Sequence, residues 1–213
     1  MTALISLKQV NLRLGHVQAL SDVSLTIQAG EQVALIGSNG SGKSSLLRVL
    51  NGLHRISQGE LQLAACRQAM LFQRPHMLRT SSWNNVALGL WLDRSLGLGW
   101  QQAKARALEA LSVVGLSGVK LQNAATLSGG QQQRVAIARA LVSDPRILIC
   151  DEPTGDLDRK TADEVLTLLQ QLNREFGKTI VMVTHESEMA SYASRVLNFR
   201  DGQLAAVREG LPA

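Results

Sequence analysis

A glycine-rich segment, Gly37-Ser38-Asn39-Gly40-Ser41-Gly42-Lys43-Ser44, matches the pattern G-x-x-x-x-G-K-[ST]. The apolar run Val33–Ile36 precedes it, and Ser45–Leu50 follows it. In such a loop the glycines let successive N–H groups point inward, and the following helix adds the positive end of its dipole. Because the loop must lie between a strand and a helix, it predicts an α/β fold with a site for nucleotide phosphates. A glycine-rich turn with a purely structural role is the less favoured alternative.

The residues of this loop have different expected tasks. Lys43 reaches the terminal phosphates, and the hydroxyl of Ser44 ligates Mg²⁺. The expected phosphate-binding residues are Gly37, Ser38, Asn39, Gly40, Ser41, Gly42, Lys43, Ser44 and Ser45.

The composition is that of one folded domain. The 213 residues are 45% hydrophobic and 18% charged, with no linker, repeat or low-complexity run. No apolar stretch approaches the roughly 20 residues of a membrane helix. Lys8 and Arg13 interrupt the start of the chain before a signal-peptide core can form. We therefore expect a soluble protein that is not exported.

The net charge of +5 raises nucleic acid or an acidic membrane surface as a partner. The basic residues are spread along the chain, and aromatic residues make up only 3% of it. A nucleic-acid-binding surface would concentrate them on one face. An ordinary solvated surface is favoured, and no nucleic-acid partner is expected.

The two cysteines, Cys66 and Cys150, have no spacing typical of a metal site or a disulfide framework. Cys150 lies in the apolar run Ile147–Cys150, where a buried thiol acts as a small hydrophobic group. Both fit a reducing compartment.

Alternating and apolar runs predict the order of elements. Residues 5–14 and 20–27 alternate in polarity, which predicts two antiparallel strands joined by a turn at Gly15-His16. Residues 81–115 have helical spacing. The other predicted strands are 32–36, 59–63, 69–72, 147–151 and 179–184, the other predicted helices are 43–52, 101–114 and 159–176, and residues 200–203 form a hairpin turn.

Two adjacent carboxylates, Asp151 and Glu152, end the predicted strand 147–151. Ligands gather at the carboxyl ends of strands in open α/β sheets. Asp151 can therefore hold the metal while Glu152 points at the water that attacks the terminal phosphate. The alternative is a solvated strand end.

A second glycine-opened helix begins at Leu127-Ser128-Gly129-Gly130-Gln131. A helix N-terminus binds anions, so this segment is a second candidate phosphate contact. Taken alone, it is more often only a helix cap and turn.

In their order and spacing these segments resemble the ATP-binding cassette (ABC) ATPases, in which LSGGQ is the signature sequence. The resemblance extends over nearly the whole chain. Residues 37–44 match the family's phosphate loop, Gln73 the Q-loop, residues 127–131 the signature, Asp151-Glu152 the second nucleotide motif, residues 155–158 the D-loop and His185 the switch histidine. Without the resemblance, His185 would be a capping or surface histidine.

The resemblance implies a P-loop NTPase fold with a mixed sheet, an N-terminal antiparallel β-subdomain and a helical subdomain that carries the signature. One ATP-binding domain would span residues 1–213. Its core and β-subdomain would take residues 1–73 and 143–213, and the helical subdomain residues 74–142.

The resemblance also implies a head-to-tail homodimer that holds two ATP molecules. Each would lie between the phosphate loop of one subunit and Ser128, Gly129, Gly130 and Gln131 of the other. Lys43, Glu152 and His185 would be catalytic, with Glu152 polarising the attacking water. Asp158 would link the two sites. Ser44, Gln73 and Asp151 would hold Mg²⁺.

Two features depart from the family pattern. Leu14 stands where family members usually carry an aromatic residue that stacks on adenine. Without that ring, either Arg13 or His16 covers adenine, or adenine is bound more weakly. The connection Glu60–Phe72 is short, which predicts a trimmed sheet without consequence for catalysis.

The resemblance implies a peripheral subunit on the cytoplasmic face of the inner membrane, docked on polytopic permease subunits. Trp83, Val86, Leu90 and Trp91 after Gln73 form a candidate docking surface, although Val86 and Leu90 are better placed to pack inside. Residues 73–79 resemble importers of tungstate and related oxyanions, which favours import with a solute-binding protein. Residues 151–158 resemble cassettes of macrolide export and lipoprotein release. A cell-division regulator stays open, and a DNA-repair or translation cassette is disfavoured because no coiled-coil insertion or second cassette is present.

Overall fold

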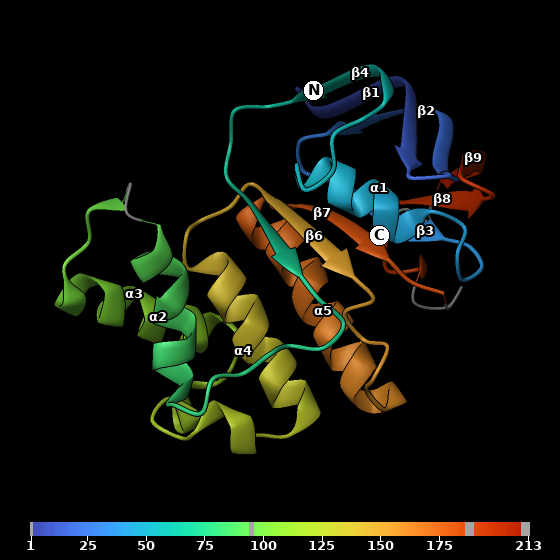
Figure 1. Ribbon diagram of the computed structural model, residues 1–213. Coiled ribbons are helices and arrows are strands. Elements are labelled where there is room, and N and C mark those ends of the chain that lie inside the picture. The colour runs from blue at the N-terminus through green and yellow to red at the C-terminus, as the bar shows by residue number, and fades with distance from the viewer. Residues whose placement is uncertain (1, 94–95, 186–189, 210–213) are drawn as a thin grey trace.

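The computed structural model describes residues 2–93, 96–185 and 190–209. Within these residues the chain forms two β-sheets with helices between and beside them (Figure 1). The larger sheet has six strands in the order β5-β6-β7-β3-β8-β9. Its strands are β3 (Gln32–Ile36), β5 (Gln68–Leu71), β6 (Ile147–Asp151), β7 (Thr179–Val183), β8 (Arg195–Arg200) and β9 (Gln203–Glu209).

The larger sheet is parallel except at one edge. β5, β6, β7, β3 and β8 pair in parallel, and β9 pairs antiparallel with β8. The carboxyl ends of five strands therefore lie along one edge, where the loop after β3 also begins. This edge places the candidate site.

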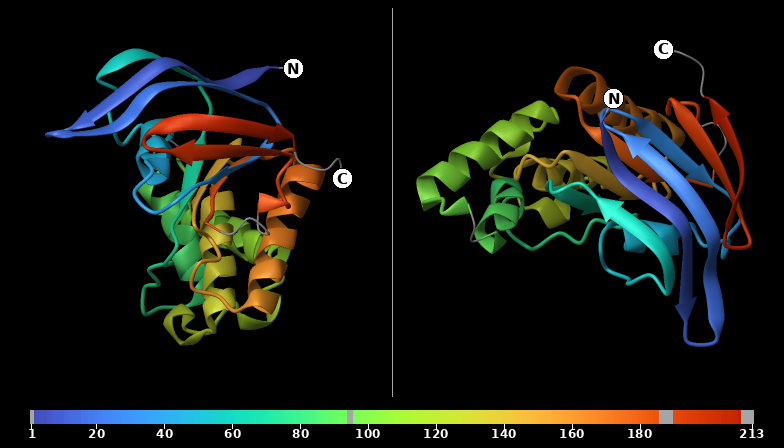
Figure 2. Two further views of the ribbon diagram at one scale, coloured as in Figure 1. Left: turned by 90° about the vertical axis from the view of Figure 1, so that its right-hand side faces the viewer. Right: turned by 90° about the horizontal axis from the view of Figure 1, so that it is seen from above.

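The smaller sheet is antiparallel, with the order β2-β1-β4. It consists of β1 (Ala3–Leu14), β2 (Val17–Gln28) and β4 (Gln58–Leu63). Leu14 pairs with Val17 across a two-residue turn at Gly15-His16. Figure 2 shows this sheet as an outer layer, on the side of the larger sheet opposite the long helices.

The helices are distributed on the two faces of the larger sheet. α1 (Lys43–Leu50) lies on the side of the smaller sheet, while α4 (Gly129–Leu141) and α5 (Arg159–Phe176) cover the other face (Figure 1). α2 (Ser82–Leu92) and α3 (Trp100–Val113) pack beside α4, away from the smaller sheet. Two short 3₁₀ helices, η2 (Ser117–Val119) and η3 (Ala124–Thr126), lead into α4.

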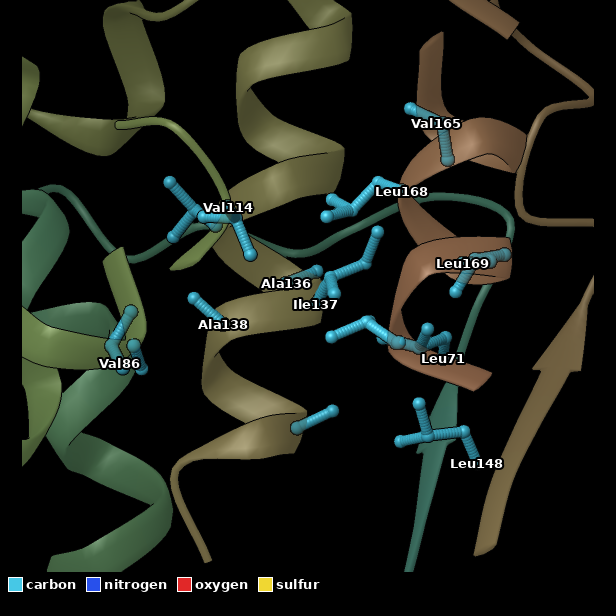
Figure 3. Packing of buried hydrophobic residues seen from close by; sticks show 14 of the residues in the cluster. Leu71, Val86, Val114, Ala136, Ile137, Ala138, Leu148, Val165, Leu168 and Leu169 are labelled. Atoms are coloured by element: carbon cyan, nitrogen blue, oxygen red, sulfur yellow. The ribbon is translucent and has the colours of Figure 1, made fainter. Parts of the chain in front are cut away.

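Both faces of the larger sheet are buried. Along β6, Ile147 and Ile149 join the core that includes α1 and the smaller sheet, whereas Leu148 and Cys150 join the core formed with the helices. A strand buried on both faces has an unbroken apolar sequence, as Ile147–Cys150 does. Figure 3 shows Leu148 beside residues of α4 and α5, such as Ile137 and Leu169.

The predicted strands and helices are confirmed to within three residues at their ends. The strand 147–151 and the helix 159–176 have the predicted bounds, and the hairpin turn at 200–203 joins β8 to β9. The helical segment 81–115 is divided into α2 and α3.

The burial of the candidate docking residues confirms the inward packing predicted for Val86 and Leu90 and corrects the expectation for Trp83. Val86 is fully buried and Leu90 is 3% exposed, because α2 packs against α3 and α4. Trp83 is also buried, so of the four proposed residues only Trp91 presents its side chain to solvent, with 41% exposed. The exposed apolar side chains nearby in sequence are Phe72, Leu78 and Leu92.

Candidate active site

The loop between β3 and α1 is enclosed by distant parts of the chain. Gly42 has φ 103°, and a Cβ atom there would lie 2.6 Å from the carbonyl oxygen of Ala19. A Cβ atom at Gly37 would overlap the carbonyl oxygen of Phe199. The N–H of Gly202 donates to the carbonyl oxygen of Ser41 at 2.8 Å. Glycine is required at positions 37 and 42 because the backbones approach so closely.

Lys43 begins α1 and is almost fully buried, with 5% of its surface exposed. Its ammonium donates to the carbonyl oxygens of Gly37 at 2.9 Å and Ser38 at 2.8 Å. Burial lowers the pKa of Lys43, and the carboxylates of Glu152 and Asp151 oppose that shift. The cation is therefore held inside the curve of the loop, close to two acids.

Ser44 and Asp151 are brought together from α1 and the end of β6. The Ser44 hydroxyl donates to Oδ1 of Asp151 at 3.2 Å. Burial raises the pKa of Asp151, the hydrogen bond from Ser44 lowers it, and Glu152 raises it. A hydroxyl and a carboxylate are the hard oxygen ligands that Mg²⁺ takes together with phosphate oxygens and water. This pair therefore fits a Mg²⁺ site.

Glu152 follows β6 and faces the segment after β7. Its Oε2 lies 3.5 Å from Nδ1 of His185. Glu152 has φ 48°, a left-handed conformation that is uncommon outside glycine and costs backbone energy. Such strain at a strand end often accompanies a functional side chain. His185 and Glu152 line a cleft of about 770 Å³ together with Gly37, Ser38 and Gln73.

Gln73 follows β5 and lines the same cleft, and its side chain forms a hydrogen bond with Asp156. Its Nε2 donates to Oδ1 of Asp156 at 3.1 Å. The neighbouring Arg74 donates from Nε to Oδ2 of Asp156 at 2.7 Å. The structure therefore places Gln73 beside the D-loop, and its expected role at the metal stays a prediction.

The signature segment caps α4. The side chains of Ser128 and Gln131 each accept a hydrogen bond from the backbone N–H of the other residue. In this capping box the Gln131 N–H donates to the Ser128 hydroxyl oxygen, and the Ser128 N–H donates to the side-chain oxygen of Gln131. Ser128 and Gly129 are exposed to solvent, whereas Gly130 is buried against Thr161 of α5. The free N-terminal end of α4 is thus available to an anion.

Asp158 caps the neighbouring helix, α5. Its Oδ1 accepts from the N–H of Thr161 at 3.1 Å, and its Oδ2 accepts from the Thr161 hydroxyl at 2.6 Å. These bonds lower the pKa of Asp158. Asp158 therefore has a local structural task in addition to the expected link between the two sites.

The two candidate phosphate-binding segments lie apart within one chain. In Figure 1 the loop between β3 and α1 is at the right of the molecule, and the start of α4 is at the bottom. The structure brings together Lys43, Ser44, Asp151, Glu152 and His185, and separates them from Ser128–Gln131. A larger hollow of about 810 Å³ between α3 and α5 contains none of these residues.

Sequence reasoning missed two residues of this region. The Asp156 carboxylate accepts hydrogen bonds from both Gln73 and Arg74, which are more than 80 positions away in the sequence. Only the opposite charges of Asp156 and Arg74 could have indicated this pairing. Asn198 of β8 lines the cleft. It stands in a strand without a recognisable motif, so no signal in the sequence points to it.

Comparison with known proteins indicates one family. A family model described as "ABC transporter" matches residues 20–155. The methionine import ATP-binding protein MetN of Clostridioides difficile is 40% identical over 221 aligned positions, gaps included. The alignment covers 96% of this chain and 68% of that protein. The lipoprotein-releasing system ATP-binding protein LolD of Bordetella pertussis is 41% identical, covering 89% of this chain and 88% of that protein. The macrolide export protein MacB of Chlorobium luteolum is 45% identical over 87% of this chain, which spans only 30% of that longer protein.

A solved structure agrees with these relatives. The ATP-binding cassette MJ0796, described as a dimer in a post-hydrolysis state bound to ADP and Pi, is 32% identical. It superimposes with a TM-score of 0.86 over 98% of this chain and 100% of that chain. The family model, which covers more than half of the chain, and these relatives show that the chain belongs to the ABC transporter family and is one of its ATP-hydrolysing cassettes.

Proposed function

We propose that this chain hydrolyses Mg²⁺-ATP as a head-to-tail homodimer and thereby energises polytopic permease subunits at the cytoplasmic face of the inner membrane. The observation that carries the proposal is the Glu152 carboxylate, 3.5 Å from His185 and in the same cleft as the phosphate loop. The proposed base, the histidine and the start of the phosphate loop then face one space. No described helix is long and apolar enough to cross a membrane.

Glu152 accepts a proton from the water that attacks the γ-phosphorus, as the bond from that phosphorus to the ADP oxygen breaks. His185, with Nδ1 3.5 Å from Oε2 of Glu152, contacts the γ-phosphate in this proposal. Lys43 neutralises charge on the phosphate oxygens, since its ammonium already lies inside the loop. These three residues are the proposed catalytic group.

Ser44, Asp151 and Gln73 are the proposed residues around Mg²⁺. When bound, the ion supplies charge neutralisation on the β- and γ-phosphate oxygens. Asp151 and Ser44 are already within hydrogen-bonding distance, so both oxygens can face one ion.

The separation of the two phosphate-binding segments supports the homodimer. One chain cannot bring its own Ser128–Gln131 to its own phosphate loop, because they lie on different sides of the molecule (Figure 1). A second copy in head-to-tail arrangement completes two sites, as closed symmetry requires. We keep the division into a core with its β-subdomain and a helical subdomain, residues 74–142, as part of this proposal.

The direction of transport is the finer part of the proposal. We assign import of a small solute such as an oxyanion, with a solute-binding protein as a further partner. The likeness of residues 73–79 to oxyanion importers and the methionine import relative support it. The lipoprotein-releasing and macrolide-export relatives support the alternative, export or lipoprotein release.

The hydrolysis proposal is tested by two substitutions with opposite effects on binding. Glu152→Gln keeps the shape of the side chain but removes the base, so we expect ATP binding to persist and turnover to fall at least 100-fold. Lys43→Ala should lose both binding and turnover. Measurement of labelled-ATP binding and phosphate release separates the two effects. Turnover by Glu152→Gln at the wild-type rate would show that Glu152 is not the base.

The direction is tested in cells that lack this chain. Uptake of oxyanions, metals, amino acids and sugars is measured with and without the wild-type gene, and Glu152→Gln serves as the inactive control. A specific uptake defect restored only by the wild type supports import. Normal uptake with altered envelope integrity or drug sensitivity assigns the cassette to export or lipoprotein release instead.

A further inference from the structure

The carboxylate of Asp156 joins two segments that lead in different directions. Asp156 lies in the D-loop between β6 and α5, whereas Gln73 and Arg74 begin the connection from β5 to α2. One oxygen accepts from Gln73 Nε2 at 3.1 Å, and the other accepts from Arg74 Nε at 2.7 Å. Both oxygens are therefore used, each by a different residue.

The chemistry of this contact fixes the orientation of the Gln73 amide. An ionised carboxylate only accepts hydrogen bonds, so the amide must turn its NH₂ group toward Asp156. Its carbonyl oxygen then remains available to a cation. The Arg74 guanidinium donates to the second oxygen of the same carboxylate at 2.7 Å.

The same place lies close to the proposed base. A Cβ atom at Gly155 would be 2.9 Å from Nε2 of Gln73 and 3.4 Å from Oε2 of Glu152. The Gln73 amide and the Glu152 carboxylate therefore flank the α-carbon of Gly155, which carries no side chain. A side chain at 155 would push the amide away from this position.

We propose that Asp156, supported by Arg74, is a positioning residue that presents the amide oxygen of Gln73 to the Mg²⁺ bound with ATP. This inference rests on the proposed function. Groups that orient a metal ligand are worth about 10- to 100-fold in metal affinity or activity. An exposed ion pair without a positioning role contributes little to stability and should not change the affinity for Mg²⁺. The Mg²⁺ affinity therefore distinguishes a positioning role from a mere surface contact.

Binding is measured in the Glu152→Gln background, where nucleotide is not consumed. A fluorescent ATP analogue is titrated with Mg²⁺, with and without Asp156→Ala. We expect Asp156→Ala to raise the Mg²⁺ concentration at half-saturation by about 10-fold. Binding of the analogue in the absence of Mg²⁺ should not change, because the phosphate loop is intact. Half-saturation within twofold of the parent would overturn the proposal.

A second variant tests the geometry without removing a charge. Gly155 does not have a positive φ, so Gly155→Ala keeps the backbone and displaces only the end of the flexible Gln73 side chain. We expect the same shift in Mg²⁺ dependence with an unchanged unfolding midpoint. Asp156→Glu, which retains the carboxylate, should recover part of the affinity that Asp156→Ala loses.

The matched control is Glu60→Gln on β4. Glu60 forms an exposed ion pair with Lys8 at 3.3 Å in the smaller sheet. The Glu60→Gln variant should keep the Mg²⁺ concentration at half-saturation within twofold of the parent value. If Glu152→Gln abolishes turnover but neither Asp156→Ala nor Gly155→Ala shifts the Mg²⁺ dependence, the positioning role is wrong while the hydrolysis proposal stands. If Glu152→Gln leaves turnover intact, the proposed function itself fails.

Discussion

Gly130 of α4 and Thr161 of α5 pack so closely that a Cβ atom at Gly130 would overlap the Cγ2 methyl of Thr161. Thr161 in turn holds Asp158 through its hydroxyl and its N–H. The starts of the two helices are thus fitted against each other. The glycine in the signature segment is required here by packing between helices as well as by any approach to phosphate.

Gly130→Ala should therefore destabilise the fold by overpacking, by about 1 to 3 kcal/mol. Thr161→Ser removes the overlapping methyl and keeps the hydroxyl that bonds Asp158. The double variant should recover most of the loss. A double-mutant cycle of urea unfolding measures the coupling. Equal losses in Gly130→Ala and in the double variant would show that the contact with Thr161 is not the cause.

Asp151→Asn should make the folded chain more stable at pH 7 while removing Mg²⁺-dependent hydrolysis. Burial raises the pKa of Asp151, so the folded state favours its protonated form. The ionised form costs stability above the folded-state pKa, and this cost disappears as the pH falls toward the unfolded value of 3.8. Thermal unfolding from pH 7 down to pH 4 should show a gain that shrinks with acidity. A gain that is the same at every pH would contradict the explanation.

Only one of the two thiols should react in the folded chain. Burial raises the pKa of Cys150 to about 12, and the side chain is inaccessible. Cys66 is partly exposed. At pH 8, alkylation followed by mass spectrometry should label Cys66 and leave Cys150 unmodified until the chain is unfolded. Labelling of Cys150 at the same rate as Cys66 would show that β6 opens under native conditions.

Leu14→Tyr should strengthen the binding of ATP. Leu14 ends β1 with 40% of its surface exposed, at the position where the family resemblance leads us to expect an aromatic residue. Stacking of a base on an aromatic ring contributes about 1 to 3 kcal/mol, which corresponds to about fivefold or more in the KM for ATP. The kcat should not change. Leu63→Tyr on β4, 36% exposed in the same sheet, is the control. Equal KM values for Leu14→Tyr and the wild type would place adenine elsewhere.

Local patterns in the sequence were sufficient for the elements, the phosphate loop and the Asp151-Glu152 pair, whereas His185 was assigned only by the family resemblance. The apolar run Ile147–Cys150 predicts a strand buried on both faces, and its end predicts the position of Asp151 and Glu152. The phosphate loop has a fixed context, so its strand and helix follow from it. These are properties of neighbouring residues, which a linear pattern records.

Contacts between distant segments could not be predicted in the same way. The carboxylate of Asp156 depends on how the connection after β5 lies against the D-loop, which is a result of strand order. The overlap at Gly130 depends on the distance between α4 and α5. Helical spacing predicted that Val86 and Leu90 pack inward, but it did not reveal that Trp83 is buried as well.

The walls of the phosphate loop come from both ends of the chain. The carbonyl of Ala19 in β2 encloses Gly42, and the carbonyl of Phe199 and the N–H of Gly202 enclose Gly37 and Ser41. During synthesis on the ribosome the loop sequence emerges more than 150 residues before its last wall. A growing chain that stops short of the hairpin at residues 200–203 therefore has the motif without its enclosure. We therefore expect nucleotide binding to require synthesis through residue 202.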